Sequence, residues 1–117
     1  MCSPDKIIYQ EYPPNSLQNG GSDGIALINS IEEVIEFISY EGTFTARNGP
    51  AYGETSVDIG VSEKERTSAS FSLQLVGEGC DRSDFTWQKL PRSSTGDANM
   101  GQTIVVCGLS LTSNDEL

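Results

Sequence analysis

The chain has 117 residues and no histidine, and its 17 acidic residues against seven basic ones give a formal net charge of −10. This length suits one domain. The charge opposes binding to nucleic acids and anionic membrane surfaces, and the lack of histidine excludes Ser-His-Asp and Cys-His catalysis. No apolar run of roughly 18 residues occurs, so no membrane span is expected. The N-terminal residues lack the basic-then-apolar pattern of a signal peptide, so none is expected and no compartment is assigned.

The first half of the chain predicts a polar N-terminal segment followed by two strands. Residues 1–22 are rich in turn-forming residues, and only Lys6–Tyr9 could form a short strand there. Gly24–Asn29 is an almost continuous apolar run, typical of a strand covered on both faces. Val34–Glu41 is rich in β-branched and aromatic residues, which favours a second strand. A helix over residues 31–40 is the alternative, because four aliphatic residues there have helical spacing.

The second half predicts a long loop and three further strands. Residues 42–70 are polar and dotted with glycine, so we expect a long connection. Ser70–Val76 alternates between apolar and polar side chains, as a half-buried strand does. Asp84–Gln88 and Gln102–Cys107 are also interpreted as strands, and residues 108–117 are expected to form a flexible C-terminal tail.

Six short segments, taken in order, resemble the later part of a bacterial lamin-tail-like domain. They are Asp23–Asn29, Ile35–Gly42, Thr55–Val61, Ser72–Leu75, Asp84–Trp87 and Gly101–Gln102. The resemblance implies an all-β, immunoglobulin-like antiparallel β-sandwich over residues 23–107, in a family often attached to secreted nucleases and surface proteins. It also implies a set of core-facing residues, namely Ile25, Leu27, Ile35, Phe37, Leu73, Leu75, Phe85 and Trp87.

The acidic, apolar segment typical of the first strands of the lamin-tail-like module has no counterpart before Asp23, so those strands are either missing or replaced by Lys6–Tyr9. A sandwich that lacks strands exposes sheet edges and an uncovered apolar face. The chain is therefore expected to self-associate as a dimer or larger assembly, or to accept a strand from a partner. The leading functional hypothesis is a non-catalytic protein interaction or assembly module, with no catalytic residue assigned.

A cation-stabilised ligand-binding module of the carbohydrate-binding kind is the alternative hypothesis, and an enzyme of unrecognised type is the third. Asp81 and Asp84 flank a turn and carry the oxygen ligands that calcium prefers, although solvated turn residues would give the same pattern. Tyr52, Tyr40 and Phe44 are the candidates for an aromatic surface that binds a protein or glycan partner. No cofactor other than calcium is expected.

The three cysteines are Cys2, Cys80 and Cys107. An odd number excludes complete pairing within the chain. A bridge between Cys80 and Cys107 is geometrically conceivable, but spacing alone does not establish one. We therefore expect free thiols, with Cys107 acting as a small buried apolar residue.

Overall fold

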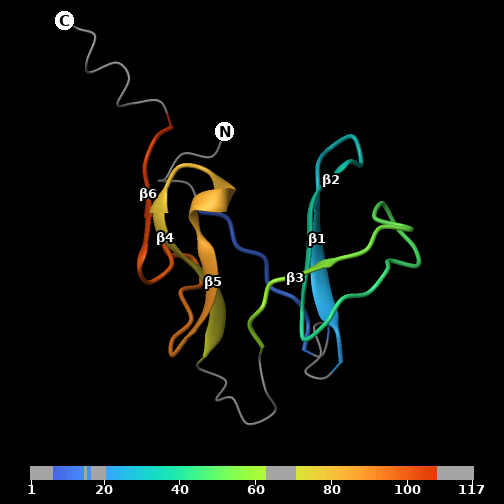
Figure 1. The fold of residues 1–117 in the computed structure, drawn as a ribbon, viewed down its shortest axis with the longest axis horizontal. Helices are drawn as coiled ribbons and strands as arrows, with labels where there is room; N and C mark the ends of the chain where they lie inside the picture. Colours follow the sequence, from blue (N-terminus) through green and yellow to red (C-terminus); the bar gives the residue numbers. More distant parts are fainter. Residues whose placement is uncertain (1–6, 15, 17–20, 63–70, 108–117) are drawn as a thin grey trace, which may run out of the picture.

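The computed structural model describes residues 7–14, 16, 21–62 and 71–107, and these are all-β apart from one short 3₁₀ helix (Figure 1). The strands form two three-stranded sheets. The first sheet has the order β1-β2-β3, with strands Asp23–Ile28, Val34–Tyr40 and Val57–Asp58. The second has the order β5-β4-β6, with strands Thr86–Leu90, Ser72–Gly79 and Gln102–Ile104. The all-β prediction is confirmed.

β1 and β2 form an antiparallel hairpin, so the strand prediction for this region is confirmed and the helical alternative is wrong. Asn29 holds the turn, because its Oδ1 accepts hydrogen bonds from the backbone N–H groups of Ile31 at 3.0 Å and Glu33 at 2.8 Å. An Asn side chain used in this way stabilises a turn against continued helix or strand. These hydrogen bonds from the turn to the Asn29 side chain therefore favour a hairpin over the helix considered for residues 31–40.

Residues 44–56 form a folded hairpin beside the first sheet, where the sequence had predicted only a long loop. Thr45 and Thr55 make an antiparallel bridge. Phe44 packs edge-on against Phe37 of β2, with ring centroids 5.3 Å apart. The rest of the predicted loop contains β3 at residues 57–58, short irregular segments at 42–43 and 59–62, and residues 63–70, which lie outside the described part of the chain.

Two buried serines join this hairpin to β2. Ser39 has 0% exposure; its Oγ accepts a hydrogen bond from Ser56 Oγ at 2.7 Å and donates one to the carbonyl oxygen of Gly42 at 2.7 Å. The backbone N–H of Phe44 donates to Ser56 Oγ at 3.0 Å. Because a buried hydroxyl is costly unless it is hydrogen-bonded, this network fixes the hairpin on one face of the first sheet.

The second sheet contains the three strands predicted for the C-terminal half, with altered ends. β4 pairs antiparallel with β5 and parallel with β6. Gln74 of β4 is buried, and its Nε2 donates to the carbonyl oxygen of Arg92 at 2.5 Å. Its Oε1 accepts a hydrogen bond from the backbone N–H of Met100 at 3.1 Å. One amide side chain therefore anchors the loop between β5 and β6 onto the central strand.

The expectation of free thiols at Cys80 and Cys107 is wrong, because these residues form a disulfide with Cα atoms 5.0 Å apart. β4 and β6 run parallel, so Cys80 after the end of β4 and Cys107 beyond the end of β6 arrive at the same end of the sheet. The backbone N–H of Val105 also donates to the carbonyl oxygen of Gly79 at 2.8 Å. Cys107 is exposed rather than buried, and it lies outside β6.

The two sheets do not close into a sandwich, and each contains a parallel pair where the family resemblance implied antiparallel sheets. Three residues implied to face the core are exposed instead: Ile25 at 40%, Leu27 at 59% and Ile35 at 59%. Phe85 is buried as implied, and the remaining four are partly buried, namely Phe37, Leu73, Leu75 and Trp87. The near-continuous apolar run in β1 is therefore not covered on both faces.

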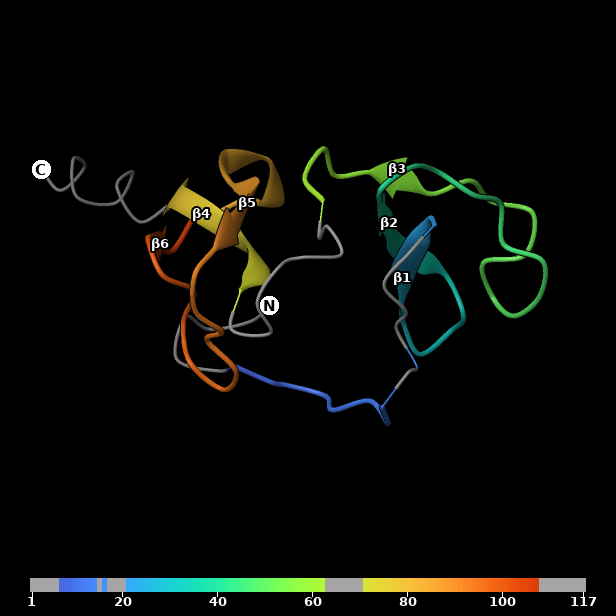
Figure 2. The same cartoon turned by 90° about the horizontal axis from the view of Figure 1, so that it is seen from below.

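The described N-terminal residues contain no strand, so residues 7–9 do not form the short strand predicted for Lys6–Tyr9. Residues 7–14 run along the molecule from the second sheet toward the first (Figure 2). Tyr9 lies beside the turn at Gly96 on the second sheet. Lys6 and the tail predicted at 108–117 lie outside the described residues.

Candidate functional site

The main candidate site is a groove between the two sheets, with a volume of about 630 Å³. One wall comes from β2, β3 and the adjoining hairpin, and the other from β5 and the 3₁₀ helix η1, which spans Arg82–Asp84. Its lining is mostly apolar with a few charged side chains. Ligand-binding clefts of small proteins commonly have this size and composition.

An apolar row crosses the first sheet on the face that borders this groove. The strand register places Ile25 of β1 opposite Ile38 of β2, and Ile38 opposite Val57 of β3. Side chains opposite one another share a face of the sheet. Glu36 lies on the same face as Ile38, and its side chain reaches the second sheet, so this face is directed toward the groove.

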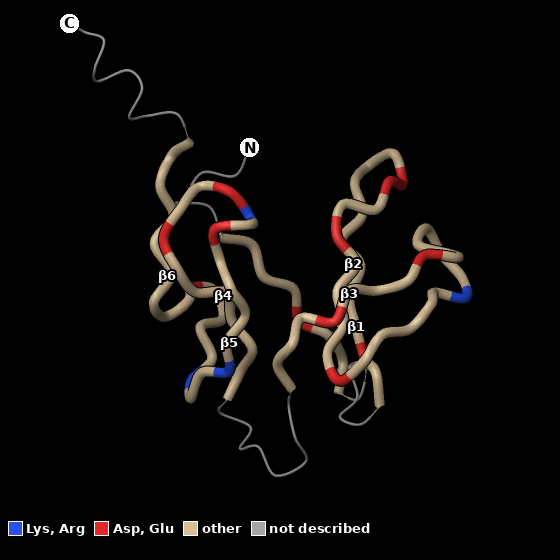
Figure 3. The backbone as a smooth tube through the Cα atoms, viewed as in Figure 1, with Lys and Arg blue, Asp and Glu red and all other residues tan. Residues whose placement is uncertain are grey.

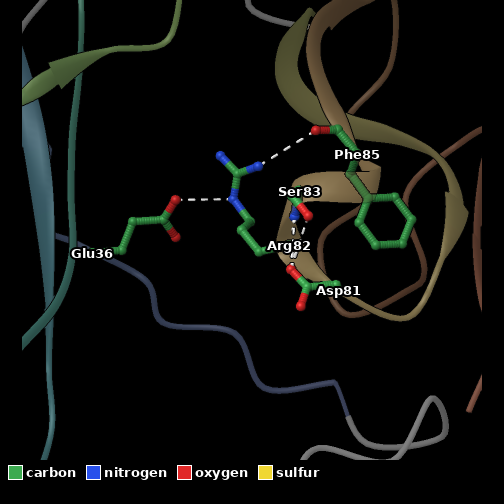
Figure 4. A network of polar contacts seen from close by, with 5 residues as sticks. All are labelled: Glu36, Asp81, Arg82, Ser83 and Phe85. Carbon is green, nitrogen blue, oxygen red and sulfur yellow. Dashed lines mark hydrogen bonds and ion pairs between the residues drawn. The ribbon is translucent and has the colours of Figure 1, made fainter. Parts of the chain in front are cut away.

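An ion pair bridges the groove between the sheets (Figure 4). Nε of Arg82 donates to Oε1 of Glu36 at 2.9 Å, and Nη1 of Arg82 donates to the carbonyl oxygen of Phe85 at 3.4 Å. The Arg82 guanidinium carbon also lies 5.7 Å from the centre of the Trp87 ring. Because both charged side chains are partly exposed, the ion pair contributes little to stability, at about 0–1 kcal/mol.

Asp81 and Asp84, the predicted calcium ligands, form the cap of η1. Oδ1 of Asp81 accepts hydrogen bonds from the backbone N–H and the hydroxyl of Ser83, both at 3.1 Å, and these bonds lower the pKa of Asp81 below its ordinary value of 3.8. Oδ2 of Asp84 accepts from the backbone N–H groups of Cys80 at 2.9 Å and Asp81 at 3.0 Å. A Cβ on Gly79 would collide with the Asp84 side chain, so glycine at that position makes room for the cap.

Calcium binding at Asp81 and Asp84 stays a prediction. The spacing of the two carboxylates matches a capping box, in which each side chain satisfies the backbone at the start of a helix. No group of three or more metal-ligating side chains occurs within the described ranges. The same Asp-x-x-Asp spacing could have suggested a cap from the sequence alone.

Two of the three predicted binding aromatics line a second cavity, of about 1010 Å³, at the hairpin of residues 44–56. Tyr52 is exposed at the tip of this hairpin, whereas Phe44 is half-buried against Phe37. Arg47, which sequence reasoning did not select, also lines the cavity. Tyr40 does not: it lies in β2 opposite Asp23.

The residues of the inter-sheet groove were not predicted as a site. Glu36 and Arg82 are 46 positions apart in the sequence, and no local motif links them. Trp87 was assigned to the core, although its ring also lines the groove. The one sequence signal that pointed toward this groove was the expectation of an uncovered apolar face.

Comparison of the chain with protein-family models, with curated proteins and with solved structures finds no match. The lamin-tail-like resemblance therefore stays a prediction. Within the described ranges, no helix is long and apolar enough to cross a membrane.

Proposed function

We propose that the chain is a non-catalytic interaction and assembly module of the lamin-tail-like type, whose immunoglobulin-like sandwich is completed by self-association. The observation that carries this proposal is the unclosed first sheet, in which Ile25 and Leu27 of the edge strand β1 are exposed. An unpaired edge strand with exposed apolar side chains gains free energy when it pairs with the edge strand of another chain.

The outer edge of β1 offers a route for assembly. β1 has six residues, and none of the backbone hydrogen bonds made outside the sheets by the described residues involves residues 23–28. Apart from Asp23 at its start, the strand has no charged residue and no proline, the features that usually protect an exposed edge. Two β1 strands paired antiparallel about a two-fold axis would join the first sheets of two chains and bury both edges.

The test is the solution mass, measured by light scattering after size exclusion at micromolar concentrations and at several salt concentrations. We expect a dimer or larger assembly that becomes more populated as salt rises, because salt screens the repulsion between chains of charge −10. The substitution Leu27→Lys should weaken assembly by placing a charge on the edge strand, although it lowers the net repulsion. Ile31→Lys in the exposed turn is the matched control. A wild-type chain that stays monomeric at every salt concentration contradicts the proposal.

The cavity beside Tyr52 and Phe44 favours a second candidate function, a cation-stabilised module that binds glycans. An exposed aromatic ring beside hydroxyl groups and the Arg47 guanidinium offers both stacking and hydrogen bonding to a sugar. Calcium-dependent thermal stabilisation together with glycan binding that Tyr52→Ala abolishes would support this function. If calcium does not raise the unfolding temperature and no glycan on an array binds, this function is excluded.

A further inference from the structure

Trp87, the single tryptophan of the chain, lines the inter-sheet groove and carries an unused hydrogen-bond donor. Its indole Nε1–H is shielded from solvent, and it has no acceptor among the described residues. Buried donors in folded proteins are almost always paired, because an unpaired one carries a free-energy cost. An incoming acceptor at this point would remove that cost.

The opposite wall of the groove offers exposed apolar side chains. Ile35 and Val57 line the groove and are 59% and 67% exposed. The row of Ile25, Ile38 and Val57 continues the apolar surface across the first sheet. An extended peptide directs alternate side chains to one side and presents backbone carbonyl groups at regular intervals, so it can use both walls together.

The charge around the groove favours a cationic occupant. Residues 21–62 contain seven acidic residues and one basic residue, Arg47, which lies in the hairpin away from the groove. The acidic positions spread over the first sheet and its turns (Figure 3). Glu36 and Glu54 both line the groove itself. Complementary charge of this kind attracts a partner and orients it.

We propose that the groove binds an extended segment of a partner protein in which aliphatic and basic residues alternate. A backbone carbonyl of the segment accepts the hydrogen bond of Trp87 Nε1, its aliphatic side chains cover Val57 and Ile35, and a basic side chain pairs with Glu36 or Glu54. Arg82, which lies over the indole ring, moves aside. Its ion pair with Glu36 is partly exposed and therefore easily exchanged for the partner's cation.

The proposal rests on the proposed function of an interaction module and names one of its surfaces. Pairing between β1 edges extends the first sheet sideways and leaves the groove open, so the two interactions are separable. They also respond oppositely to salt. Self-association of an acidic chain strengthens as salt rises, whereas binding of a cationic peptide weakens.

The test uses a labelled decapeptide of alternating lysine and valine, with an alternating glutamate and valine peptide as the control. We expect saturable binding of the lysine peptide in fluorescence anisotropy, accompanied by a change in tryptophan emission, which reports on Trp87 alone. Trp87→Phe keeps an aromatic ring and removes the N–H, and it should weaken binding roughly two- to tenfold. Val57→Ser should also weaken binding, whereas Ile31→Ser, equally exposed but outside the groove, should not.

Equal affinity for the glutamate peptide, the absence of saturable binding, or wild-type affinity in both Trp87→Phe and Val57→Ser would overturn the proposal. Circular dichroism of each variant establishes that it is folded, and Val57→Ser provides the test if Trp87→Phe does not fold. Light scattering on the same samples separates the two proposals. If the chain is a monomer that binds the lysine peptide, the groove proposal stands and self-association is refuted. If the chain assembles but binds no peptide, self-association stands and the groove proposal is refuted.

Discussion

The disulfide between Cys80 and Cys107 is expected to supply a large share of the stability of the second sheet. β6 has three residues, and the bridge fixes the chain just beyond its end onto the end of β4. The two cysteines are 27 residues apart, and the loop-entropy model for a closed loop of this length gives about 3.5 kcal/mol at 25 °C. Small domains have total stabilities of about 5–15 kcal/mol, so this loss would be readily measured.

The assay is urea unfolding followed by Trp87 fluorescence, on the oxidised wild type, the reduced wild type and the double variant Cys80→Ser, Cys107→Ser. We expect reduction and the double substitution to lower the unfolding midpoint equally, by about 1–3.5 M for the slopes usual in small proteins. Cys2→Ser is the control, because it removes a cysteine without touching the bridge, and it should leave the oxidised midpoint unchanged.

A count of free thiols tests whether the bridge between Cys80 and Cys107 forms. The chain has three cysteines and two of them form the bridge, so the unfolded oxidised protein should titrate one thiol and the reduced protein three. Three thiols in protein purified under oxidising conditions would mean that the bridge does not form. A bridge that forms without altering the urea midpoint would refute the stability argument alone.

Three further predictions concern buried polar groups and the cap of η1. Ser39→Ala removes the centre of the buried serine network and should cost about 1–3 kcal/mol in urea unfolding, whereas Ser30→Ala in the exposed turn should change stability by less than about 0.5 kcal/mol. Gln74→Leu leaves the loop after β5 without its anchor and should cost about 1–3 kcal/mol, with faster amide exchange at residues 92–100; unchanged exchange would contradict this role. Asp81→Ala should be less stable than wild type at neutral pH. Since folding lowers the pKa of Asp81, that difference should persist above pH 3.8 and disappear as the pH falls further, and a difference that does not change with pH would contradict the capping role.

Strands with a clear side-chain period could be predicted from the sequence, and strands defined by distant pairing could not. The alternation in Ser70–Val76 and the β-branched content of Val34–Glu41 both led to real strands. β3 has two residues and exists because the hairpin of residues 44–56 returns the chain to the edge of β2. Neither its length nor its parallel pairing leaves a local pattern, since such pairing depends on contacts between separate segments.

The candidate sites follow the same rule: residues carried by one hairpin could be grouped from the sequence, and residues joined by pairing of distant strands could not. Phe44 and Tyr52 share a cavity because one hairpin carries both, which sequence proximity could suggest. Tyr40 is close in sequence to Phe44, but it belongs to β2, where it lies opposite Asp23, and it does not line this cavity. The prediction of free thiols failed because three cysteines still allow one disulfide and one free cysteine. The sequence does not show which two pair, whereas the parallel arrangement of β4 and β6 brings Cys80 and Cys107 together.

The most buried side chains of the described residues are mainly polar, and this links stability to binding. Ser39 and Ser56 are buried in one hydrogen-bond network and Gln74 in another, while Ile25 and Val57 of the apolar row beside the groove stay exposed. Hydrogen bonds therefore hold each sheet together, but the apolar face of the first sheet remains uncovered. Burying that face against a partner would lower the free energy further. Any partner that covers it binds the folded chain only, so a ligand at 100 times its dissociation constant should add about 2.7 kcal/mol to the free energy of unfolding. A lysine–valine peptide that binds without raising the unfolding temperature would have to bind the unfolded chain as well, and the groove would then not be its site.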